Sequence, residues 1–228
     1  MRPALQLRAR VARGVARLAW PLVRRLSLRR EHRGFRLLSF FSSVEGMDEV
    51  AHARIALALD LIAAVDPRRF ARIRRDMPNI RVIRAGGGFF EAAIPTCVVD
   101  WPHVMWNPVV ELAKTIVHEA THARLHRAGI DYPERWQRRF ERRCLLEEVA
   151  FLRRLPDGGA QAARREAQVE PALASEWWLP HNAIERAIAQ ARAESVPRWL
   201  LRWLEYRQAR LARRAAARRG RHDRGAGS

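Results

Sequence analysis

The strongest structural signal in the sequence is a helix predicted over residues 109–127, which carries two histidines one turn apart. Its centre reads His118-Glu119-Ala120-Thr121-His122. Side chains four residues apart lie one above the other on a helix, so His118 and His122 can direct their imidazoles at one point. Neutral imidazole is a good zinc ligand. Glu119 flanks the same face, where it can take a proton from a zinc-bound water. We therefore predict a Zn²⁺ site with Glu119 as its catalytic base.

The rest of the sequence places this helix in an α+β fold that is mostly helical with a small β-sheet. Further helices are predicted at 48–65, from 67 to Met77, and at 134–155, 160–169, 181–194 and 197–219. Strands are predicted at 80–84, 89–93 and 96–101, with Gly86-Gly87-Gly88 as a hairpin turn between the first two.

The basic residues gather at the two ends of the chain. The net charge is +19, but residues 1–34 carry +9 of it and residues 207–228 carry +7, so the centre is nearly neutral. We divide the chain into a basic amphipathic segment (1–34), a metallohydrolase domain (35–206) and a basic disordered tail (207–228). Residues 1–34 could lie on an anionic membrane surface, or dock on the protein's own core.

Nearly all of the basic residues are arginine, and Lys114 is the one lysine. Selection for phosphate contacts would use both types, so the ratio indicates a coding bias and no specific nucleic-acid partner. No apolar stretch reaches the length that spans a bilayer. Cys97 and Cys144 lie in apolar contexts without a disulfide pattern, so we expect buried thiols and a cytoplasmic protein, with peripheral membrane contact as an alternative.

A zinc site needs a third protein ligand, and the helix predicted at 134–155 offers Glu147 and Glu148. Both fall within or beside an apolar stripe of that helix, formed by Trp136, Phe140, Cys144, Phe151 and Leu155. A carboxylate on an apolar face is costly unless it is paired or coordinated. The alternative is that the two glutamates are exposed and balance nearby arginines.

The residues around the two histidines fit a buried helix with one exception. Positions 120, 121 and 123 are uncharged, whereas Arg124 stands where an apolar residue is expected. His126 is a weaker candidate ligand, because a third turn carries its ring past a metal held by His118 and His122.

The two motifs together, His118-Glu119-Ala120-Thr121-His122 and Glu147-Glu148-Val149-Ala150, resemble the gluzincin branch of zincin metallopeptidases. The resemblance covers roughly residues 79–155. It implies a zincin-like active-site helix, a peptide or protein substrate, and a third ligand in a Glu-x-x-Ala setting, which selects Glu147 with Glu148 as the alternative. It also implies that an edge strand, here 96–101, pairs with the substrate. Phe151 stands where such proteins often have Asp.

The oxyanion donor of such an enzyme is left open among Tyr132, His181 and Tyr206. Two other functions are also consistent with the sequence. One is a catalytically silent, zinc-stabilised protein that binds a membrane surface or a protein partner. The other is a basic helical protein without metal that binds nucleic acid or lipid. The sequence does not indicate an oligomeric state.

Overall fold

The computed structural model describes residues 20, 21, 25, 27–39, 46–83, 88–130, 136–175, 202 and 206. The elements, in chain order, are β1 (Leu28–His32), β2 (Phe35–Ser39), α2 (Met47–Val65), α3 (Pro67–Asp76), β3 (Asn79–Ile83), β4 (Phe89–Glu91), β5 (Thr96–Asp100), α4 (Trp101–Trp106), α5 (Val109–Arg127), α6 (Gln137–Leu152), α7 (Gly159–Ala167) and α8 (Val169–Ala174). They combine helices with one small mixed sheet, which confirms the predicted α+β class. By its contacts the chain divides into two units, and all of these elements belong to the first, Met1–Ile83 with Gly87–Ala174.

The sheet has the strand order β1-β2-β3-β5-β4, with three parallel strands in its centre and an antiparallel strand at each edge. The β1–β2 hairpin was not expected from the sequence. Its two-residue turn, Arg33-Gly34, has positive φ at both positions, which suits the twist of a tight hairpin. The hairpin therefore spans residue 34, where the sequence suggested a domain boundary.

The prediction that residues 96–101 form the edge strand is wrong. β5 pairs with β3 on one side and with β4 on the other, and its first four residues are buried. Burial on both faces explains its continuous apolar run. Of the strands that the structure describes, β4 is the one beyond β5 at this edge of the sheet.

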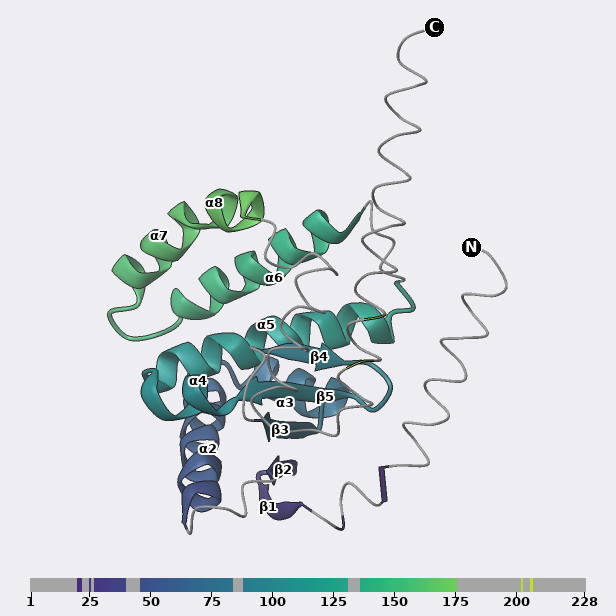
Figure 1. Ribbon diagram of the computed structural model, residues 1–228. Coiled ribbons are helices and arrows are strands. Elements are labelled where there is room, and N and C mark those ends of the chain that lie inside the picture. Colours follow the sequence, from purple (N-terminus) through teal and green to yellow (C-terminus); the bar gives the residue numbers. More distant parts are fainter. Residues whose placement is uncertain are drawn as a thin grey trace, which may run out of the picture. The chain divides into compact units, whose positions relative to one another are not determined.

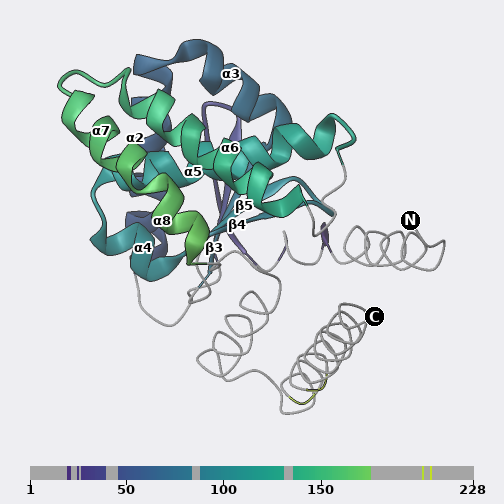
Figure 2. The same cartoon turned by 90° about the horizontal axis from the view of Figure 1, so that it is seen from above.

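Helix α5 occupies the centre of the unit (Figure 1). It contacts α2, α3, α6 and the strands β4 and β5. Figures 1 and 2 show α5 along one face of the sheet, with α6 on its other side and α7 and α8 beyond α6. Its apolar side chains Leu112, Ala113, Ile116, Val117 and Ala123 belong to the main core. Because α5 is covered on several sides, its polar residues are buried too.

The ends of α5 coincide with the predicted bounds, 109 and 127. Pro108 precedes its first turn, and Gly129 follows with a positive φ of 72°. The N–H of Gly129 donates to the carbonyl of His126, and the N–H of Ile130 donates to that of Leu125. This is the Schellman arrangement, in which a glycine satisfies the last carbonyls of a helix.

Beyond the main core, α6 packs with α7 and α8 around a second apolar cluster. Its members are Leu145, Val149, Leu152, Ala162, Val169 and Leu173. The sequence predicted α6 and α7 within a few residues of their ends, but not the short α8. The described residues do not include the helix predicted at 181–194, nearly all of the helix predicted at 197–219, most of the amphipathic segment 1–34, or residues 207–228. Among the helices that are described, none has the length and apolar character to cross a membrane.

In the turn between α6 and α7, position 158 has room only for a glycine. A Cβ on Gly158 would collide with the backbone oxygen of Leu152, whereas a Cβ on the neighbouring Gly159 would meet nothing within 4 Å. Gly158→Ala should therefore lower the free energy of unfolding by about 1–3 kcal/mol, the usual cost of overpacking. Gly159→Ala should leave it nearly unchanged. Urea unfolding of both variants measures the difference, and equal midpoints would contradict this account of the turn.

Candidate metal centre

His118 and His122 converge as the helical spacing predicts. Their Nε2 atoms lie 3.2 Å apart, and the ring centroids are 5.0 Å apart. His118 is buried, and the side chain of His122 is 13% exposed. Two imidazole nitrogens bound to one tetrahedral zinc at ~2.0–2.1 Å would lie about 3.3 Å apart. The spacing of the pair therefore fits a shared ion.

The carboxylate that meets these nitrogens belongs to Glu141, on the facing helix α6. Glu141 Oε2 lies 3.4 Å from His118 Nε2, and Glu141 Oε1 lies 3.6 Å from His122 Nε2. The Glu141 side chain is 9% exposed, and its Oε2 has no hydrogen-bond partner among the described residues. A buried carboxylate oxygen left without a hydrogen bond is costly. Bound zinc would satisfy it, so the residues present fit the metal.

Glu148 serves a different purpose from the one predicted for it. Its Oε1 accepts a 2.7 Å hydrogen bond from His118 Nδ1, and its Oε2 accepts one of 2.7 Å from Arg165 Nε on α7. Both oxygens are therefore occupied, and the bond orients the His118 ring so that its Nε2 faces His122 and Glu141. Glu148 orients the histidine and is not placed as a ligand.

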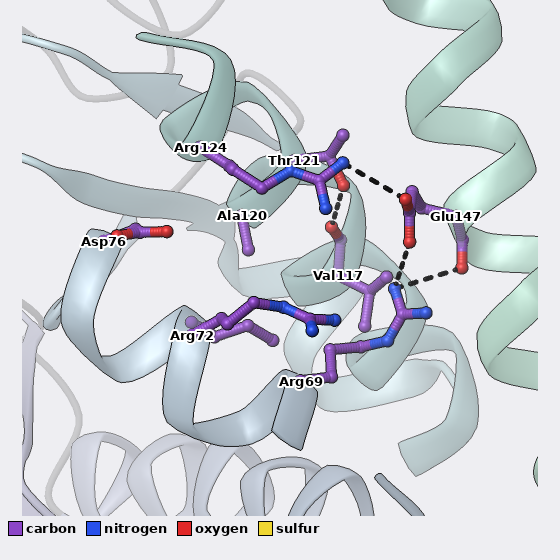
Figure 3. A pocket seen from close by; sticks show the side chains of 9 residues that line it. Arg69, Arg72, Asp76, Val117, Ala120, Thr121, Arg124 and Glu147 are labelled. Atoms are coloured by element: carbon purple, nitrogen blue, oxygen red, sulfur yellow. Dashed lines mark hydrogen bonds and ion pairs between the residues drawn. The ribbon is translucent and has the colours of Figure 1, made fainter. Parts of the chain in front are cut away.

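Glu147 is bonded to arginines, and Figure 3 shows its side chain directed toward Arg69 and Arg124. Its Oε2 accepts from Arg69 at 2.8 Å, and its Oε1 accepts from Arg124 at 3.1 Å and from Arg143 at 2.7 Å. It lines a shallow pocket between α3 and α5 with Arg69 and Arg124. The choice of Glu147 as third ligand is thus not supported, because three arginines already satisfy its carboxylate.

Glu119 is buried beside His118 and His122. It is 5% exposed, and its carboxylate accepts a hydrogen bond from the backbone N–H of Phe90 in β4. A Cβ on Gly88 would come within 3.7 Å of Glu119 Oε1, so the chain before β4 passes close to the acid. Burial, reinforced by the charges of Glu141 and Glu148 against the opposing charge of His118, raises the pKa of Glu119 to about 7.

The two histidines have opposite electrostatic environments. Burial lowers the pKa of His118, but the nearby carboxylate of Glu141 and the hydrogen bond to Glu148 outweigh it and raise this pKa to about 10. Burial and the neighbouring charge of His118 lower the pKa of His122 to about 4. A cluster of carboxylates thus holds positive charge at this point of the core, where a metal ion could take the place of the proton.

One further donor, Cys144, stands at the edge of the cluster. Its Sγ lies 3.5 Å from His122 Nε2, and His118, His122 and Cys144 each place one ligand atom within 4.8 Å of the others. Burial, followed by the charge of Glu141, raises the pKa of this thiol well above its ordinary value.

Glu141 and Cys144 were the two site residues that the sequence did not reveal. Both lie on α6 three residues apart, and Glu141 follows Phe140 of the predicted apolar stripe. That position was a signal of the same kind as the one used for Glu147 and Glu148. His126, the weaker candidate, instead packs against Phe90, with ring centroids 5.8 Å apart and the rings tilted by 56°.

The predicted oxyanion donors remain predictions. Tyr132 and His181 lie outside the described residues, and Tyr206, which is 60% exposed, belongs to the second unit of the chain. His103 on α4 was not considered from the sequence. Its Nε2 lies 2.9 Å from the hydroxyl of Thr115, one turn before Glu119 on α5. The oxyanion donor therefore stays unassigned.

Comparisons of the chain with protein-family models, with curated proteins and with solved structures found no match. The gluzincin resemblance thus stands on the two short motifs alone.

The three glutamates of α6 should differ in their effect on zinc binding. Glu141→Gln should raise the Kd for zinc by more than about 100-fold, since it removes a ligand. Glu148→Gln should raise it about 10–100-fold, the cost of losing an orienting partner. Glu147→Gln should leave it unchanged while weakening the fold. Competition with a chromophoric chelator measures all three, and retention of zinc by Glu141→Gln with loss by Glu147→Gln would restore the assignment made from sequence.

Proposed function

We propose that the chain is a zinc-dependent hydrolase of peptide bonds, in which His118, His122 and Glu141 hold the ion and Glu119 is the general base. The observation that supports this most is the convergence of two imidazole nitrogens with a buried carboxylate whose Oε2 has no hydrogen bond from the described residues. Glu119 lies in the same helix turn and is not needed as a ligand. This arrangement matches catalytic zinc sites, which use three protein ligands.

The chemistry divides between the ion and the chain. Bound zinc would polarise the scissile carbonyl and lower the pKa of water. Glu119 takes a proton from the attacking water on a carboxylate oxygen and returns it to the leaving amine. Burial keeps bulk water away from that proton, and the N–H of Phe90 holds the carboxylate in place. Glu148 keeps the His118 ring oriented while the charge nearby changes.

A peptide substrate is supported by the position of β4. This strand is antiparallel to β5 and ends the order of described strands, so an extended peptide could pair with its outer edge. Glu119 lies near the start of β4, since a Cβ on Gly88 would come within 3.7 Å of its Oε1, so a peptide bound along this strand would pass near the general base. This assigns to β4 the substrate-pairing role predicted for residues 96–101.

Glu119→Gln should abolish hydrolysis while the protein keeps its zinc. We expect a loss of about 10²–10⁴-fold in kcat/KM, the contribution of a positioned acid–base group, because the amide cannot accept the proton. The assay is cleavage of a mixed fluorogenic peptide library by zinc-loaded protein, with the zinc content measured on the same sample.

Glu111→Gln is the matched control, because Glu111 lies in the first turn of the same helix and pairs with Lys114. It should change neither zinc content nor cleavage. Undiminished cleavage by Glu119→Gln would refute the role given to Glu119, and an absence of zinc from the wild-type protein would refute the metal centre itself.

A further inference from the structure

We propose that Cys144 is a fourth protein ligand of this metal centre and that its thiolate closes the position that water must enter. The inference rests on the proposed zinc site and adds a means of regulation to it. A tetrahedral zinc with Zn–N of ~2.0–2.1 Å and Zn–S of ~2.3 Å sets the sulfur and nitrogen about 3.6 Å apart. The Sγ of Cys144 lies 3.5 Å from Nε2 of His122. The distance between Cys144 Sγ and His122 Nε2 therefore already matches that between two ligands of one zinc ion.

The missing hydrogen bond at Glu141 Oε2 is an independent observation that points to a ligand here. Glu141 Oε2 is buried, lacks a hydrogen-bond partner among the described residues, and lies 3.4 Å from His118 Nε2. Glu141 and Cys144 are three residues apart on α6, so their side chains project from the same face. His118 and His122 are four apart on α5, and the two helices pack together. Glu141 and Cys144 thus both lie within reach of the histidine pair, Glu141 at 3.4 Å from His118 Nε2 and Cys144 at 3.5 Å from His122 Nε2.

The second cysteine of the chain has no such position. Cys97 is fully buried in β5 within the main apolar core, whereas the group of metal-binding side chains found among the described residues contains Cys144. The two thiols are equally buried, so burial alone does not distinguish them. Their different neighbours make Cys97 a matched control for Cys144.

Filling the fourth coordination position of the zinc ion with a thiolate has a chemical consequence. As the sulfur–metal bond forms, the thiol proton leaves to solvent, and no electron is transferred. Four protein ligands are typical of structural zinc sites, and catalytic sites keep one position for water or substrate. The zinc-loaded protein would therefore be latent while Cys144 is bound, and would become active when the thiolate is displaced.

Cobalt substitution tests the coordination directly. Co²⁺ takes zinc sites and gives a near-ultraviolet charge-transfer band only when a thiolate is bound. We expect this band in the wild-type protein and in Cys97→Ala, and its loss in Cys144→Ala with the visible ligand-field bands retained. We also expect Cys144→Ala to raise the Kd for the metal about 10-fold or more, because losing even an outer partner costs 10–100-fold.

Hydrolysis provides the second readout. Zinc-loaded Cys144→Ala should cleave the peptide library faster than the wild-type protein, Cys97→Ala should cleave at the wild-type rate, and adding Glu119→Gln to Cys144→Ala should remove the gain. Wild-type protein that binds Co²⁺ without a thiolate band would overturn the role of Cys144 and leave the proposed zinc site standing. Wild-type protein that binds no Co²⁺ at all would overturn both, and this measurement does not depend on the folding of any variant.

Discussion

The fold depends on burying a polar cluster between α5 and α6. Glu119, Glu141 and Glu148 are all buried with His118, and charged groups are costly to bury unless they compensate one another or bind a cation. Here the compensation is partial. Glu148 is satisfied by His118 and Arg165, but Glu141 Oε2 is not satisfied by the described side chains. A positive charge between the two helices would therefore stabilise their packing. The surrounding helices and strands shield this position from water.

The secondary structure that the sequence predicted best is the part fixed by local signals. The bounds of α5 follow from Pro108 and Gly129, and β5 follows from its apolar run. The β1–β2 hairpin was missed because arginines interrupt its alternation. Its formation depends on β2 pairing with β3 across the α2–α3 crossover. The edge position of β4 was missed for the same reason, since strand order is set by long-range pairing and not by the local pattern.

The candidate site likewise has a part that the local sequence predicts and a part that depends on long-range packing. The spacing of His118 and His122 is a property of one helix, so their convergence could be predicted. Which glutamate of α6 faces them depends on how α6 is rotated against α5, which no local pattern records. Arg124 was the neglected signal: it departs from the expected apolar position on α5 because it binds Glu147 on α6. Together with Arg69 it binds the carboxylate of that glutamate.

Charge balance links the two roles assigned to the centre. Zinc held by two neutral imidazoles and the Glu141 carboxylate would keep one formal positive charge, which would favour the ionised form of the adjacent Glu119. Addition of the Cys144 thiolate makes the sphere formally neutral. Glu119 then loses its compensating charge in a buried position, and its neutral form, which cannot act as a base, is favoured. A thiolate ligand would thus oppose catalysis twice, by occupying the place of water and by keeping the proton on Glu119. Displacement of one ligand would reverse both effects together.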